Sequence, residues 1–96
     1  MSNNMSVATN GFTALMLASQ RGHVKVVQLL LEHGARTDIV SAYGQSALFM
    51  AIMNDHPRVV KILLDWGSDK NARDVVGYLP IQYTNNTEII EMLENA

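Results

Sequence analysis

The chain repeats itself with a period of 33 residues. The segment GFTAL at residues 11–15 recurs as GQSAL at residues 44–48 and, more loosely, as GYLPI at residues 77–81. A second segment, VVQLLL at residues 26–31, returns after the same interval as VVKILL at residues 59–64. A period of this length is typical of stacked supersecondary units that share one hydrophobic core. The repeat therefore constrains the fold more than any other feature of the chain.

Each unit is predicted to run helix, turn, helix and loop. Thr13 and Ser46 each precede a short apolar run, and their hydroxyls can accept a hydrogen bond from a free helix N–H group. Pro57 suits the first turn of a second helix, and Gly34 and Gly67 follow the second helices, where glycine enters the left-handed region cheaply. The apolar side chains recur at helical spacing: Leu15, Leu17, Ala18, Val26, Val27, Leu29 and Leu30, then Leu48, Met50, Ala51, Val59, Val60, Ile62 and Leu63. We expect Leu63 to be buried between repeats.

These residues resemble the ankyrin repeat family. Its pattern runs Gly-x-Thr-Pro-Leu-His-x-Ala, then Gly-His, then Val-Val-x-Leu-Leu-Leu, then Gly-Ala-Asp. The first unit matches through GFTAL, Ala18, Gly22-His23, residues 26–31 and Gly34-Ala35. The second unit matches through Gly44, Ser46, Leu48, Ala51, His56, residues 59–64 and Gly67-Ser68-Asp69.

The resemblance covers about residues 8 to 96 and implies an all-α fold. This fold is an ankyrin-repeat solenoid of three stacked helix-turn-helix units joined by hairpin-like loops, with the last unit shortened. We expect a short N-terminal segment at residues 1–7 and an ankyrin repeat domain at residues 8–96. Its repeats would span about residues 8–40, 41–73 and 74–96.

The units also depart from the family pattern. The position of the family's histidine holds Met16, Phe49 and Gln82, so the hydrogen bond that this histidine contributes is absent. The third unit aligns its residues 89–93 with residues 26–30 only if three residues are missing after Thr84. Leu79 replaces the Thr or Ser at the cap position of that unit. We therefore expect the C-terminal helix to be the weakest part of the fold.

Composition is typical of one folded domain and excludes several function classes. The 96 residues are 48% hydrophobic and 17% charged, and a net charge of −2 gives no electrostatic reason to bind nucleic acid or an anionic membrane. The chain has no cysteine, which excludes disulfides and thiolate metal sites. No apolar run approaches the roughly 18 residues of a membrane span. Because residues 1–7 show no signal-peptide pattern, we expect an intracellular protein, cytoplasmic or nuclear.

The sequence does not support catalysis. His23 and His56 occupy equivalent places at the turn between helices, where the resemblance implies a packing role. His33, next to a terminating glycine, can interact with a helix C-terminus. No pair of histidines has the i, i+4 spacing of a metal site, and no serine, histidine and carboxylate form a recognisable triad. We expect no enzyme, no metal and no cofactor.

The resemblance instead implies a concave face, made of loop tips and the ends of the first helices, that binds another protein. Tyr43, Met53 and Tyr78 stand where the fold does not need an apolar side chain, and Arg21 and Arg73 would flank them as a polar rim. The candidate contact residues are Phe12, Arg21, Tyr43, Gln45, Met53, Asn54, Arg73 and Tyr78, with Thr9, Asn10, Gln20, Val40, Ala42, Val75 and Val76 beside them. The three valines have an alternative role, since β-branched residues stiffen loops.

Two function classes remain open from the sequence. The first is a non-catalytic protein-protein interaction module that uses the concave face. The second is a structural subunit, or a self-associating piece of a larger assembly, that forms a weak homo-oligomer through uncapped repeat ends. For the second class we expect Leu17 and Val24 to be partly uncovered in the first repeat. Trp66, on the opposite side of its repeat, is expected to cover the end of the neighbouring repeat.

Overall fold

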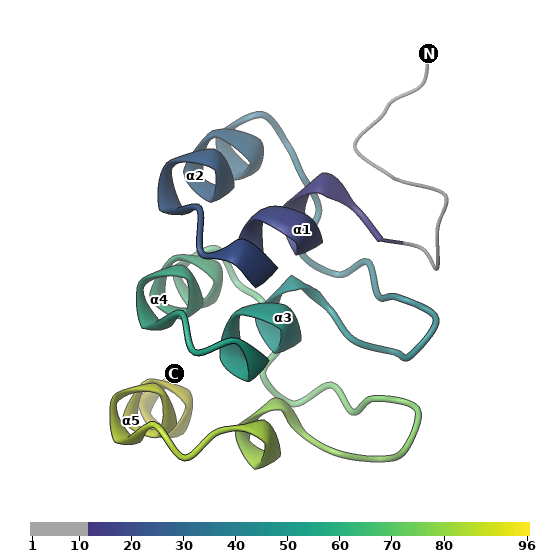
Figure 1. The fold of residues 1–96 in the computed structure, drawn as a ribbon, viewed down its shortest axis with the longest axis vertical. Helices are drawn as coiled ribbons and strands as arrows, with labels where there is room; N and C mark the ends of the chain where they lie inside the picture. The colour runs from purple at the N-terminus through teal and green to yellow at the C-terminus, as the bar shows by residue number, and fades with distance from the viewer. Residues whose placement is uncertain (1–11) are drawn as a thin grey trace.

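The computed structural model describes residues 12–96 as a stack of helix pairs (Figure 1). The helices are α1 (Ala14–Arg21), α2 (Val24–Glu32), α3 (Ala47–Met53), α4 (Pro57–Asp65), the short 3-10 helix η2 (Pro80–Tyr83) and α5 (Thr87–Asn95). The elements α1, α3 and η2 form one layer, and α2, α4 and α5 form the other. Long loops leave the stack on the side of the first layer (Figure 1). The predicted all-α arrangement of three units is confirmed.

The caps of the first helices differ between the units. The side chain of Thr13 accepts a hydrogen bond from the backbone N–H of Met16 at 3.1 Å, as predicted for an N-cap. Ser46 occupies the same position before α3, but its hydroxyl makes no capping bond, so the prediction was wrong for this residue. Pro57 begins α4 as expected, and Gly22 ends α1 in the left-handed region with φ 71°.

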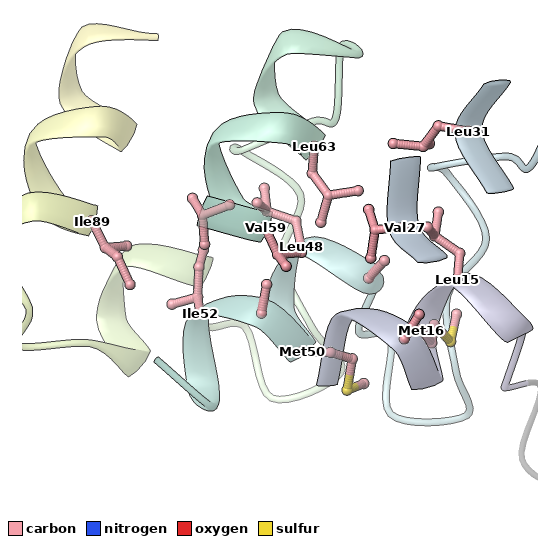
Figure 2. Packing of buried hydrophobic residues seen from close by; sticks show 14 of the residues in the cluster. Leu15, Met16, Val27, Leu31, Leu48, Met50, Ile52, Val59, Leu63 and Ile89 are labelled. Atoms are coloured by element: carbon pink, nitrogen blue, oxygen red, sulfur yellow. The ribbon is translucent and has the colours of Figure 1, made fainter. Parts of the chain in front are cut away.

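The hydrophobic core runs through the stack between the two layers (Figure 2). Leu63 of α4 is fully buried, as predicted, and lies between repeats. Met16 and Phe49, which replace the family's histidine, are also fully buried, so apolar packing fills the place of that polar side chain. The other largest buried side chains come from every unit: Leu15, Val27, Leu31, Leu48, Ile52, Val59, Val60, Pro80 and Ile89.

The loops between units are hairpin-like, as expected. In the first loop the backbone N–H of Ser41 donates to the carbonyl of Gln45 at 2.9 Å, and in the second the N–H of Asp74 donates to the carbonyl of Tyr78 at 3.0 Å. Gly44 and Gly77 take positive φ values of 75° and 91° in these turns. The N–H of Val75 also donates to the carbonyl of Tyr43 at 3.0 Å, which ties the second loop to the first.

The third unit is shortened at its first helix. The 3-10 helix η2 has four residues, whereas α1 has eight and α3 has seven. The backbone N–H of Leu79, at the expected cap position, donates to the side chain of Gln82 at 2.8 Å. Helix α5 does have a side-chain cap, because the side-chain Oδ1 atom of Asn86 accepts from the backbone N–H groups of Glu88 and Ile89. The missing cap therefore affects η2 and not α5.

Candidate functional site

Exposed apolar side chains gather on the two loops. Within residues 12–96, eight large hydrophobic residues are exposed, and five of them lie on the loops. We call these five, Val40, Tyr43, Val75, Val76 and Tyr78, the loop patch. Val75 and Val76 are each 67% exposed, so the loop-stiffening role expected for valines leaves their side chains open to solvent. The remaining three are Val26, Leu29 and Trp66.

Asp74 holds the second loop together from within. Its side chain is buried, and its Oδ1 atom accepts hydrogen bonds from the backbone N–H groups of Val76 at 3.1 Å and Tyr78 at 2.9 Å. Its Oδ2 atom accepts from the Gln45 amide at 3.3 Å and from the Tyr83 hydroxyl. Because Gln45 belongs to the first loop and Tyr83 to η2, Asp74 joins the loop patch to the helices behind it.

These hydrogen bonds decide the charge state of Asp74. Burial is the largest single influence and favours the neutral acid, but the bonds from Tyr83, Tyr78, Gln45 and Val76 together hold the pKa of Asp74 below its usual value of 3.8. The same bond to Asp74, assisted by burial, raises the pKa of Tyr83 above its usual value of 10.0. The loop is therefore fixed by a carboxylate that accepts a hydrogen bond from a neutral tyrosine.

Tyr78 is connected to the core through Tyr83. The Tyr78 and Tyr83 rings meet edge to face with centroids 5.8 Å apart, and Tyr83 meets the buried Phe49 in the same manner at 6.0 Å. The expectation that the fold does not need an apolar side chain at position 78 was therefore incomplete, although the Tyr78 side chain remains 49% exposed. Tyr43 is 58% exposed.

The structure divides the predicted contact residues into two groups. Tyr43, Gln45, Arg73 and Tyr78 come together on the loops, where Gln45 is partly buried against Asp74. Arg73 donates from its guanidinium to the carbonyl of Gly77 at 2.7 Å and lies exposed beside the patch.

The other predicted residues lie elsewhere. Arg21, Met53 and Asn54 stand at the C-terminal ends of α1 and α3, while the loops lead into the N-terminal ends of these helices. A helix of seven residues such as α3 is about 10 Å long, so these residues are not part of the loop patch. Phe12 is partly buried against the core. Thr9 and Asn10 lie outside the described residues.

A shallow groove surrounds Met53 at that far end. It runs between the end of α3 and the segment from η2 to α5, and an Asn86 amide that donates to Asp55 at 2.6 Å bridges its sides. Its lining residues are Ile52, Met53, Asp55, Tyr83, Thr84, Asn85 and Asn86. No sequence pattern indicated this groove, because residues 83–86 reach it only through the shortened turn.

Two of the three histidines make structural hydrogen bonds, whereas His23 is exposed, so the packing role expected for it was wrong. His56 donates from Nε2 to the carbonyl of Gln20 at 3.0 Å, and His33 donates from Nδ1 to the carbonyl of Leu29 at the end of α2 at 2.8 Å. Among residues 12–96 no three His, Cys, Asp or Glu side chains are grouped to hold a metal ion. Of the helices in the described part of the chain, none is long and apolar enough to cross a bilayer.

A family model described as Ankyrin repeats (3 copies) matches residues 1–74 of the chain. The protein therefore belongs to the ankyrin repeat family. Ankyrin repeats are generally protein-interaction modules and typically non-catalytic. No curated protein sequence matches the chain. The family match ends at Asp74, and the stack continues beyond it through η2 and α5.

Proposed function

We propose that this protein is a non-catalytic binding module that contacts another protein through the loop patch. The observation that carries the proposal is the gathering of Val40, Tyr43, Val75, Val76 and Tyr78 on two loops that hydrogen bonds hold together. Exposed apolar clusters of this kind are uncommon on a monomer unless they serve as contact surfaces. A rigid patch also supports binding, because its side chains lose little conformational freedom in a complex.

The patch fits a partner with an apolar segment. Tyrosines and valines supply contact area, and Arg73 lies exposed beside them. The exposed pair in which Arg36 binds Asp38 through two hydrogen bonds of 3.0 and 2.8 Å precedes Val40 in the chain. This arrangement of apolar centre and polar rim matches the usual anatomy of protein interfaces. The contribution of Arg21, Met53 and Asn54 is a second part of the proposal, since they lie at the far ends of α1 and α3.

Site-specific photocrosslinking tests the proposal. A photoreactive amino acid replaces Tyr43 or Val76 in the loop patch, and Trp66, which is 51% exposed at the C-cap of α4, serves as the matched position outside it. We expect the same protein to be captured from both loop positions and not from position 66. Capture of the same set of proteins from all three positions would contradict the proposal.

Substitutions then measure what the patch contributes. Tyr43→Ala should weaken binding of the captured protein by about thirtyfold, the effect of losing about 2 kcal/mol at an aromatic anchor. Tyr78→Phe keeps the ring that packs on Tyr83 and serves as the control for Tyr78→Ala, which loses it. Equal affinity of Tyr43→Ala and the unmodified protein would exclude Tyr43 as an anchor.

A further inference from the structure

One face of α2 is exposed although the same face is buried in the other units. Val26 is 45% exposed, whereas Val59 and Ile89, which occupy its position in α4 and α5, are fully buried. Helix α4 packs against α2, and α5 packs against α4, so each of these faces is covered by the preceding unit. Among residues 12–96 no unit precedes α2, and Leu29 beside Val26 is 50% exposed.

Two further pairs of equivalent residues show the same difference. Met50 of α3 is 3% exposed, while Leu17 at its position in α1 is only partly buried. His56 donates to the carbonyl of Gln20 in the preceding unit, while His23 is exposed and its ring makes no such bond with residues 12–96. The expectation that Leu17 is partly uncovered is confirmed. The first unit thus presents a surface shaped to receive another helical layer.

The opposite end of the stack does not complement this surface. Helix α5 exposes Glu91 and Glu94, so a second copy stacked head to tail would press carboxylates against Val26 and Leu29. The α2 face carries one cation, Lys25, beside its own carboxylate, Glu32, so at least one of the added carboxylates would be buried without a partner, which is costly. Head-to-tail stacking is therefore unfavourable, and an isologous contact of the α2 face with itself is the alternative for a second copy.

The charges on α2 favour this self-contact. Lys25 and Glu32 are both exposed, and neither forms an ion pair with residues 12–96. They are seven residues apart, about two helical turns, so they lie on the same side of Val26 and Leu29. If two α2 helices pack antiparallel about a two-fold axis between Gln28 and Leu29, Lys25 of each copy meets Glu32 of the other. A parallel arrangement does not bring these charges together.

We propose that the α2 face is a dimer interface for a second copy of this chain, with the two α2 helices antiparallel. Val26 and Leu29 form its apolar centre, and two Lys25–Glu32 pairs fix its direction and register. This goes beyond the proposed function, because the loop patch lies on the loops of the other layer and stays free in such a dimer.

Sedimentation of the full chain tests the interface. We expect the wild type to form a dimer as its concentration rises to about 0.5 mM, where a micromolar Kd gives mostly dimer. Leu29→Asp places two carboxylates at the centre of the interface and should raise Kd at least about tenfold. Circular dichroism checks that this variant keeps its helices, which the exposure of Leu29 allows. A wild type that stays monomeric at this concentration overturns the proposal.

Charge reversal tests the antiparallel direction. Lys25→Glu and Glu32→Lys each create two like-charge pairs, so each variant alone should be more monomeric than the wild type. Mixed in equal amounts they restore both pairs and should form a heterodimer. Arg58→Glu and Glu91→Lys make the same charge changes on α4 and α5 and should leave the dimer unchanged when measured alone. Failure of the mixture to form more dimer than either variant alone overturns the arrangement.

Cross-linking provides a measurement that does not depend on weakening the dimer. The chain has no cysteine, so Leu29→Cys introduces one thiol that lies next to its copy at the two-fold axis. We expect it to form a disulfide-linked dimer under mild oxidation much faster than Arg58→Cys, the control on α4. Equal rates for the two variants contradict the proposed interface.

Discussion

His56 binds the preceding repeat at two points. Its Nε2 atom donates to the carbonyl of Gln20 at 3.0 Å, and its ring lies against Gly22, where an added Cβ atom would come within 2.5 Å of Nδ1. Gly22 also has a φ of 71°, which side chains other than glycine rarely adopt. The turn between α1 and α2 and the turn between α3 and α4 therefore fit each other only with glycine at position 22.

The first prediction concerns this contact. Gly22→Ala should destabilise the fold more than Gly34→Ala, because both residues have positive φ but nothing lies within 4 Å of a Cβ at position 34. The backbone strain common to both is about 1–2 kcal/mol, and the contact with His56 adds to it only at position 22. Urea unfolding measures the difference. His56→Ala in the Gly22→Ala background should reduce the additional destabilisation at position 22. An equal loss of unfolding free energy for the two glycine variants would contradict the prediction.

The second prediction concerns the core. Leu63→Ala should reduce the free energy of unfolding by about 2–5 kcal/mol, since Leu63 is fully buried between repeats and its truncation leaves a cavity. Leu29→Ala is the matched control, because Leu29 is 50% exposed and surface truncations usually stay within about 0.5 kcal/mol. Thermal melting of both variants at low concentration compares them. A shift of only a degree or two for Leu63→Ala would mean that its cavity collapses without cost.

The period of the sequence predicted the helix pairs and the burial of Leu63, because apolar spacing records which side of a helix faces a neighbour, whereas the hairpin-like form of the loops was implied by the resemblance to ankyrin repeats. It did not distinguish Val26 from Val59. Both are valines at one position of the repeat, yet one is 45% exposed and the other fully buried. The exposed fraction of a side chain at this position depends on whether another unit packs against it. The identity of the residue does not indicate whether such a unit is present.

The candidate site was predictable in part for a similar reason. The resemblance to ankyrin repeats, carried over position by position, placed Tyr43 and Tyr78 on the exposed loops. It gave no indication of Asp74, whose position in the first loop is Ser41. Ser41 accepts from the N–H of Tyr43 at 3.2 Å, but the longer acidic side chain of Asp74 also reaches Gln45 and Tyr83. Asp74 makes these additional hydrogen bonds because its side chain is longer and because the shortened helix η2 brings Tyr83 within reach. The 33-residue period indicates neither.

The third prediction concerns pH. The folded-state pKa of Asp74 is lowered, so its contribution to stability is present above the unfolded value of 3.8 and is lost as pH falls through the lower folded value. Tyr83 has a raised pKa, so its contribution is lost only as pH rises above 10.0. Asp74→Asn should therefore reduce stability at pH 7 and flatten the decline of stability below about pH 4.

Unfolding measured at several pH values checks this prediction. Asp65→Asn is a control, since Asp65 is an exposed acid whose partner, Lys61, forms a surface ion pair with it. We expect the control to keep the acid dependence of the wild type. Identical pH profiles for Asp74→Asn and the wild type would show that the hydrogen bonds of Asp74 do not favour its charged form in the folded state.

The fourth prediction concerns α5, which packs against α4 at the end of the described stack, whereas α4 lies between α2 and α5. In the layer of α1 and α3, the third unit has only the four-residue η2, so α5 has a shorter partner helix than α2 and α4 have. Amide hydrogen exchange should therefore be faster across α5 than across α4. Lys70 limits the effect at the C-terminal end, because its ammonium group donates to the carbonyls of Leu93 at 2.6 Å and Ala96 at 3.0 Å.

Lys70→Ala should increase exchange in the last turn of α5 severalfold, since a cation at a helix C-terminus stabilises it by about 0.3–1 kcal/mol. Lys25→Ala is the control, because Lys25 is exposed on α2, whereas α5 packs against α4. We expect Lys25→Ala to leave exchange in α5 unchanged. If α5 and α4 are equally protected in the wild type, the shortened unit is as stable as the middle one, and the loss of three residues before α5 has no energetic consequence.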